Sequence, residues 1–204
     1  KEAEASFRSA LEINPELAEA HYNLGNTLKD LSRFFDAEAS YRRALEIKPD
    51  YAEAYNNMGT SLVNLGRLDE ARASYRMAHQ LGFYGARVKE ALMLPAIMGT
   101  RQEVLESRIT FEQNLDKLIA EKVRLDDPLH DVGNTNFYLA YHGLNDRDLQ
   151  VKVAKYYEQA CPSLLYAAPH CSRSKPDAQK KIRVGFLSKF LYNHSVSLCF
   201  SKIV

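Results

Sequence analysis

The chain has 204 residues and a mass of 23.2 kDa, enough for one or two domains, and its 27 Lys and Arg against 26 Asp and Glu argue against a nucleic-acid partner held by a basic field. Hydrophobic residues make up 46%, which is too apolar for disorder, yet no uncharged apolar run reaches the roughly 18 residues of a membrane span. Three cysteines make no disulfide framework, so we expect a cytoplasmic protein without a membrane partner.

A repeat occupies the first third of the chain. Its period is 34 residues, the difference between the positions of Pro15 and Pro49 (49 − 15). The stretches around these prolines align without a gap, as FRSALEINPELAEAHYN and YRRALEIKPDYAEAYNN. Aromatic, alanine and glycine positions recur at the same spacing: Phe7, Tyr41 and Tyr75, then Ala10, Ala44 and Ala78, then Gly25 and Gly59. Because several independent positions share one period, the sequence predicts a stack of structural repeats.

Each repeat is predicted to be a pair of helices. The apolar spacing places one pair near residues 16–31 and 34–48 and the next near 50–65 and 68–82. The recurring glycines lie inside the first helix of each pair, where glycine costs about 1 kcal/mol relative to alanine. We therefore expect close contact between helices at both glycines.

These positions resemble tetratricopeptide (TPR) repeats. Ala37, Tyr41, Ala44 and Pro49 match the small, aromatic, small and proline positions of that pattern. Residues 1–15 resemble the second helix of an earlier repeat. In the third pass, Phe83 stands where proline is due and Met93 where glycine is due. The expected solenoid therefore covers residues 1–82, with one half and two full repeats.

Asn23 and Asn57 lie one period apart on the first helix of each pair, which lines the concave groove in TPR arrays. An amide side chain donates to and accepts from a peptide backbone at once. We therefore predict that both asparagines bind an extended peptide. The alternative is that they simply occupy a solvent-exposed face. Ala91 holds the next register, so the asparagine ladder ends there.

Residues 83–161 are predicted to form a helical connector that lacks this period. Apolar side chains at helical spacing predict helices over 84–98 and 100–123. The run Asp126–Pro128 is expected to break the chain after the second of these helices. Further helices are expected over Thr135–His142 and from about Asp146 to Ala160.

Several aromatic and histidine side chains of the connector are candidates for a functional role. His130 and His142 have no partner at metal-ligand spacing, so both are predicted to be surface or packing residues. Phe137, Tyr138 and Tyr141 lie at i, i+1 and i+4, which favours a core-facing stripe over a stacking platform.

A proline-containing linker is predicted over residues 162–181. Cys161, His170 and Cys171 lie at its start and middle, but their spacing fits no common zinc site. We therefore expect no metal.

The sequence pattern then changes from helical to β-rich at the carboxyl end. The run Ile182–Ser188 is predicted to be a strand, followed by a loop that ends at His194 and a helix that Ser195 caps. This order is how a Rossmann-like lobe begins, so residues 182–204 are expected to be the first βα unit of such a lobe. The overall prediction is thus a mainly α chain that ends in a βα unit.

The combination of repeats, connector and βα start resembles the O-GlcNAc transferase/SPINDLY family of glycosyltransferases. The resemblance rests on IRVGFLS followed by NHS, and on the middle stretch DPLHDVGNTNFYLAYHGLNDRDLQ, which is similar to the connector of bacterial members. It covers essentially the whole chain. It implies an enzyme with two Rossmann-like lobes that moves a sugar from a nucleotide-sugar donor, such as UDP-GlcNAc or GDP-fucose, to Ser or Thr of protein acceptors without a metal or other cofactor.

The resemblance also assigns roles to individual residues. His194 matches the family's active-site histidine beside the acceptor, where an imidazole would accept the hydroxyl proton or position the acceptor. Ser195 follows it where animal members usually have proline. Asn23 and Asn57 match the peptide-binding asparagines. Because the family's donor-binding residues have no match within residues 1–204, we expect this stretch alone to be inactive.

Two functions follow as alternatives from these observations. The first is the TPR and connector part of a protein O-glycosyltransferase, with acceptor proteins bound in the groove. The second is a non-catalytic TPR scaffold that binds peptide segments of partner proteins. Exposed ends of the solenoid and a lone strand would also favour self-association.

Overall fold

The computed structural model of the chain describes residues 2–95, 97–133 and 137–165, which are mainly helical and include no strand. The first part contains α1 (Glu2–Ile13), α2 (Ala18–Asp30), α3 (Phe34–Ile47), α4 (Ala52–Asn64) and α5 (Leu68–Gln80). The second contains α6 (Gly85–Ala91), α7 (Arg101–Glu121), α8 (Pro128–Asp131), the 3-10 helix η1 (Phe137–His142), α9 (Arg147–Ala160) and the 3-10 helix η2 (Pro162–Leu165).

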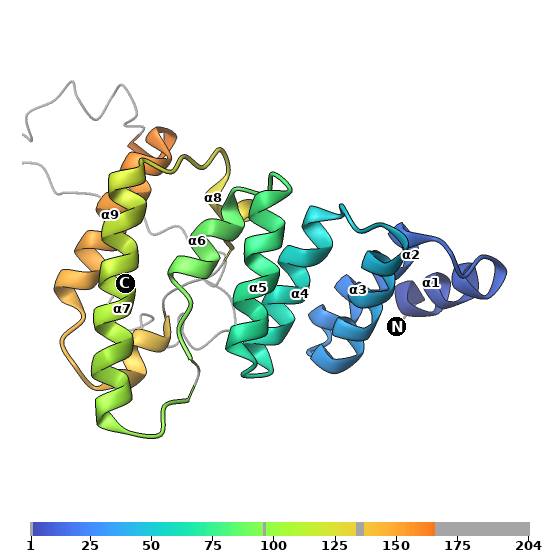
Figure 1. The fold of residues 1–204 in the computed structure, drawn as a ribbon, viewed down its shortest axis with the longest axis horizontal. Helices are drawn as coiled ribbons and strands as arrows, with labels where there is room; N and C mark the ends of the chain where they lie inside the picture. The colour runs from blue at the N-terminus through green and yellow to red at the C-terminus, as the bar shows by residue number, and fades with distance from the viewer. Residues whose placement is uncertain (1, 96, 134–136, 166–204) are drawn as a thin grey trace, which may run out of the picture. The chain divides into compact units, whose positions relative to one another are not determined.

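The predicted helix pairs are confirmed as α2 with α3 and α4 with α5, and the bounds agree closely at every end. Consecutive helices from α1 to α6 pack against one another, and Figure 1 shows them as antiparallel neighbours in chain order. The packing is almost entirely between nearest neighbours, as expected when each repeat buries its apolar face against the next one.

The recurring glycines lie where one helix of a pair touches the ring of the other. A Cβ atom on Gly25 would lie 2.6 Å from Cε1 of Tyr41, and one on Gly59 would lie 2.8 Å from the ring of Tyr75. Both tyrosine rings are fully buried. The expected close contact is therefore confirmed, and it explains why each repeat accepts the cost of glycine inside a helix.

A ladder of ion pairs joins each repeat to the one before it. Arg33, at the start of α3, pairs with Glu4 of α1 at 2.9 Å, and one period later Arg67 pairs with Glu38 of α3. Each arginine also pairs with an acidic residue three positions further along the chain. Glu38 is buried, so its charge depends on these partners.

The connector has a separate apolar core, built mainly by α7 and α9, which lie side by side in Figure 1. Its members include Phe111, Leu115, Leu139, Val153 and Tyr156. Helix α6 contributes to both cores, because Ala86 packs with the repeats whereas Val88 and Ala91 pack with the connector. This short helix is therefore where the stack of repeats and the connector meet.

Three connector predictions differ from the structure. The helix expected over residues 84–98 ends at Ala91, because the chain turns there to reach α7. The helix expected from Thr135 is described only from Phe137, as a 3-10 helix. Tyr141 is expected to face a core but is 69% exposed. In a 3-10 helix, positions four apart lie about a third of a turn from each other, so the expected i, i+4 stripe does not form.

Other predictions concern residues that the structure does not describe. Most of the linker over 162–181, the strand Ile182–Ser188, and His194 with Ser195 lie outside the described residues. Among the helices within 2–95, 97–133 and 137–165, none has the length and apolarity that a membrane crossing needs.

Candidate functional site

Asn57 holds two inner helices of the stack together. Its Nδ2 donates to the hydroxyl of Tyr22 at 3.2 Å and to Oδ1 of Asn26 at 2.8 Å, both on α2. Its Oδ1 accepts from Nδ2 of Asn56 at 3.0 Å. Both donor positions are thus occupied within the protein, and one lone pair of Oδ1 is left to accept from a ligand N–H.

Asn23 is placed differently from Asn57. It is half-buried on α2, and no hydrogen bond from the described residues reaches its side chain. It lines neither the cavity of about 230 Å³ that Asn57 lines nor the larger cavity next to it, both described below. The structure therefore does not gather the two predicted peptide-binding residues into one cavity.

The hydroxyl groups of the buried tyrosines form hydrogen bonds with the same two inner helices, α2 and α4. Tyr41 donates to Oδ1 of Asn26 at 2.8 Å, and one period later the hydroxyl of Tyr75 lies 3.2 Å from that of Thr60. Burial raises the pKa of Tyr75 to about 12, with the Thr60 bond opposing the shift, so the phenol is neutral at physiological pH. Each repeat thus has a phenol-based tie between its two helices.

Asn56 carries an unsatisfied acceptor beside this network. The residue is only 4% exposed, and its Oδ1 has no hydrogen-bond partner among the described residues. A buried polar atom left in this state costs about 1–3 kcal/mol. Such an atom marks a place where a donor from a ligand would be favourable.

A hollow of about 230 Å³, here called the Lys89 hollow, opens on the inner helices beside these asparagines. It is mainly polar and takes side chains from α2, α4, α6 and α8. Its lining residues are Tyr22, Lys29, Glu53, Asn56, Asn57, Thr60, Phe83, Lys89, His130, Val132 and Gly133.

The Lys89 ammonium group is desolvated within this hollow. Burial lowers the pKa of Lys89 to about 8, and the positive charge of Lys29 lowers it further, whereas Asp131 opposes the shift. Among the described residues no carboxylate lies within ion-pair distance of its Nζ atom. The hollow therefore contains a cation that the described part of the chain leaves unpaired.

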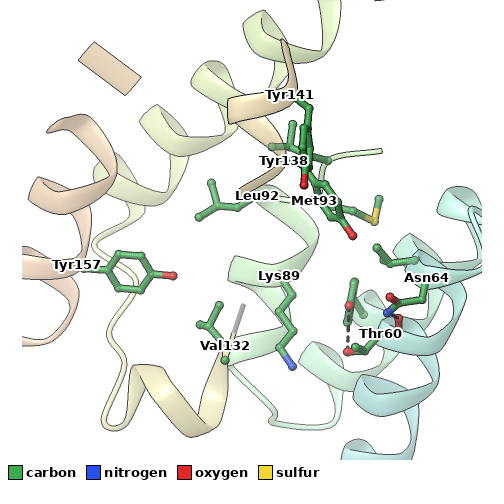
Figure 2. A pocket seen from close by; sticks show the side chains of 13 residues that line it. Thr60, Asn64, Lys89, Leu92, Met93, Val132, Tyr138, Tyr141 and Tyr157 are labelled. Atoms are coloured by element: carbon green, nitrogen blue, oxygen red, sulfur yellow. Dashed lines mark hydrogen bonds between the residues drawn. The ribbon is translucent and has the colours of Figure 1, made fainter. Parts of the chain in front are cut away.

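A larger cavity of about 540 Å³, here called the tyrosine pocket, lies next to this hollow and shares lining residues with it. Figure 2 shows Thr60 and Asn64 entering it from α4, Lys89 from α6, and Tyr138 and Tyr141 from η1. Its other lining residues are Val63, Tyr75, Leu92, Met93, Leu94, Val132, Gly133 and Tyr157. The two cavities adjoin, because Thr60, Lys89, Val132 and Gly133 line both, and we call them together the groove.

The two histidines of the connector, His130 and His142, differ in their surroundings. His130 lies at the rim of the Lys89 hollow with Nδ1 3.2 Å from Asp131. Both ring nitrogens of His142 are buried without a hydrogen-bond partner in the described part of the chain, and burial together with nearby Arg108 lowers the pKa of this imidazole. In the same residues, no three His, Cys, Asp or Glu side chains gather as metal ligands.

Sequence reasoning missed Lys89, Asn56 and Tyr22 as groove residues. The available signal was their position within the repeat. Lys89 follows His21 and Tyr55 at intervals of one period, so the three residues occupy the same position on the inner helices of successive repeats. Asn56 and Tyr22 are likewise one period apart. The periodicity that indicates Asn23 and Asn57 therefore also indicates Lys89, Asn56 and Tyr22 as residues of the inner helices.

Comparison with known proteins supports the presence of the repeats. The family model of the tetratricopeptide repeat matches residues 16–81, which span α2 to α5. No curated protein matches the chain. The chain is thus a TPR-containing protein with a helical segment after its repeats.

Proposed function

We propose that the chain binds an extended peptide segment of a partner protein along the groove formed by the Lys89 hollow and the tyrosine pocket. Support comes from the TPR match, since such repeats generally bind protein partners. The observation that carries the proposal is that the Lys89 hollow, which Asn56 and Asn57 line, adjoins the tyrosine pocket. Amides bind a peptide backbone whatever its side chains are.

Replacing Asn57, whose amide lines the groove, tests peptide binding. A peptide selected from a random library against residues 1–204 should bind Asn57→Ala about five- to tenfold more weakly, because about 1 kcal/mol of hydrogen bonding is lost. The double variant with Asn23→Ala should be weaker still if Asn23 also contacts the peptide. Isothermal titration calorimetry measures the Kd.

The control removes an amide elsewhere. Gln113 is exposed on α7, away from both cavities, so Gln113→Ala should leave the Kd unchanged. Thermal melts verify that all variants fold. Hydrogen exchange shows whether the peptide protects α4 and α6. If it does, and if Asn57→Ala binds the peptide with unchanged affinity, the role assigned to this amide is contradicted.

A second candidate is that the chain is the acceptor-binding part of a protein O-glycosyltransferase. The specific observation in its favour is the resemblance carried by IRVGFLS and the NHS run that contains His194. In this proposal the groove holds the acceptor protein while a nucleotide sugar, such as UDP-GlcNAc or GDP-fucose, is the donor. No metal is required.

Sugar transfer can be tested with labelled donors. Full-length protein incubated with a panel of radiolabelled nucleotide sugars and the selected peptide should label that peptide with one sugar, whereas residues 1–204 alone should not. In the full-length protein, His194→Ala should lower kcat by about 10²-fold or more and leave donor affinity unchanged, as expected for an acceptor-side group. Transfer by residues 1–204 alone, or loss of donor binding in the variant, would contradict these assignments.

A further inference from the structure

Lys89 presents a half-buried ammonium group for which the described residues supply no ion-pair partner. The one carboxylate whose charge acts on Lys89 among the described residues has other contacts: Asp131 contacts His130 and accepts from the backbone N–H of Asp127. Glu53 is exposed at the edge of the same hollow. Burying an unpaired charge is unfavourable, so a carboxylate that enters the hollow is stabilised by pairing with this ammonium group.

Asn56 gives a second, independent sign of a ligand in the same hollow. Its orphan Oδ1 is an acceptor, whereas Lys89 is a donor and a cation. One amino-acid residue of a peptide carries both complements, because its backbone N–H donates and an acidic side chain accepts. A phosphate or a simple anion would satisfy only the lysine.

The lining of the tyrosine pocket determines which kind of peptide side chain fits beside the acidic one. Leu92 and Met93 line it together with the rings of Tyr75, Tyr138 and Tyr157, and it begins at Lys89. A large apolar side chain gains free energy by leaving water for such a lining. An acidic side chain at Lys89 and an apolar one beyond it would thus be neighbours in one extended segment.

We propose that the groove selects an internal peptide segment in which an aspartate or glutamate side chain pairs with Lys89 and an adjacent large apolar side chain fills the tyrosine pocket. This inference rests on the peptide-binding function proposed above and specifies its ligand. The residues that decide specificity are Lys89 for the acid, Asn56 for the backbone and Met93 with its neighbouring tyrosines for the apolar side chain.

Short synthetic peptides test the proposal directly. The probe is an eight-residue, acetylated and amidated peptide with adjacent glutamate and leucine in a serine–glycine background. Matched peptides replace glutamate by glutamine or leucine by alanine. Residues 1–204 should bind the first peptide at least fivefold more tightly than either replacement. Lys89→Met should abolish the preference for glutamate over glutamine and keep the preference for leucine.

Controls separate this inference from its alternatives. Lys117→Met changes an exposed lysine of α7 and should retain the glutamate preference. A glutamine peptide with a free carboxyl terminus tests the other source of a carboxylate, and binding restored only by that terminus would overturn the side-chain assignment. Equal binding of the glutamate and glutamine peptides overturns the inference but leaves peptide binding intact. Absence of binding by all peptides, with a dimer seen by light scattering, would overturn it in favour of a second copy as the occupant.

Discussion

Gly85→Ala should destabilise the protein by about 2 kcal/mol, the middle of the range for overpacking, and displace α8 from α6. A Cβ atom at this position would lie 2.4 Å from the backbone oxygen of Asp131 and 2.7 Å from its Cβ. A backbone carbonyl cannot rotate aside as a side chain can, so the helix that carries it must move. The higher helix propensity of alanine offsets only part of this loss.

Chemical denaturation measures the loss of stability, and the NMR signals of backbone amides report the displacement of α8. The free energy of unfolding should fall, and the amide signals of Val132 and Gly133, which follow α8 and line both cavities, should shift. Gly99→Ala is the matched control, because its Cβ would meet only the flexible carboxylate of Glu103 at 3.4 Å. Equal stability of the two variants would mean that α8 does not rest on Gly85.

Lys89→Met should stabilise the protein by about 2 kcal/mol at pH 7, because it keeps most of the aliphatic stem and removes the desolvated ammonium group. Burial and the charge of Lys29 lower the pKa of Lys89 to about 8 in the folded state, from 10.5 otherwise. One pKa unit corresponds to about 1.36 kcal/mol. Since the side chain stays partly accessible, the expected gain is below the full value of that difference.

The pH dependence of this gain follows from the direction of the shift. Below pH 8 the folded protein must hold the charged amine, so the gain from methionine is complete there. Between pH 8 and 10.5 the folded state loses the proton while the unfolded state keeps it, so the wild type recovers stability and the gain vanishes. Urea titrations at pH 7 and pH 10 measure it, with Lys117→Met as the exposed control. A loss of stability at pH 7 would contradict the unpaired state of Lys89.

The repeat helices were predictable because their signals are local and occur twice. Gly25 and Gly59 indicated close packing from their spacing alone, since a destabilising residue at a fixed helical position requires a neighbour that needs the space. The rings of Tyr41 and Tyr75 are that neighbour. Periodicity thus gave both the elements and one class of contact between them.

The connector and the groove were less predictable because their contacts join segments far apart in the chain. Tyr141 has helical spacing to Phe137, but the 3-10 geometry of η1 gives it a different direction. The register of the repeats places Lys89 on an inner helix, but the partial burial of its side chain depends on α8, and no local pattern predicts that α8 lies beside α6. Asn57 was found as a groove residue, but its bonds to Tyr22 and Asn26 depend on the neighbouring repeat.

The inter-repeat ion pairs give the stack a direction. Glu4 and Glu38 receive an arginine from the following repeat, but one period later the chain carries Arg72, which pairs with Asp69 of its own helix. A further copy of α4 and α5 stacked behind α5 would bring its Arg67 against Arg72, whereas a further copy of α2 and α3 inserted after α3 would bring its Arg33 against the carboxylate of Glu38. A single inversion of charge therefore encodes where the array can be elongated, and Arg72→Glu is the change an engineer would make first to extend it.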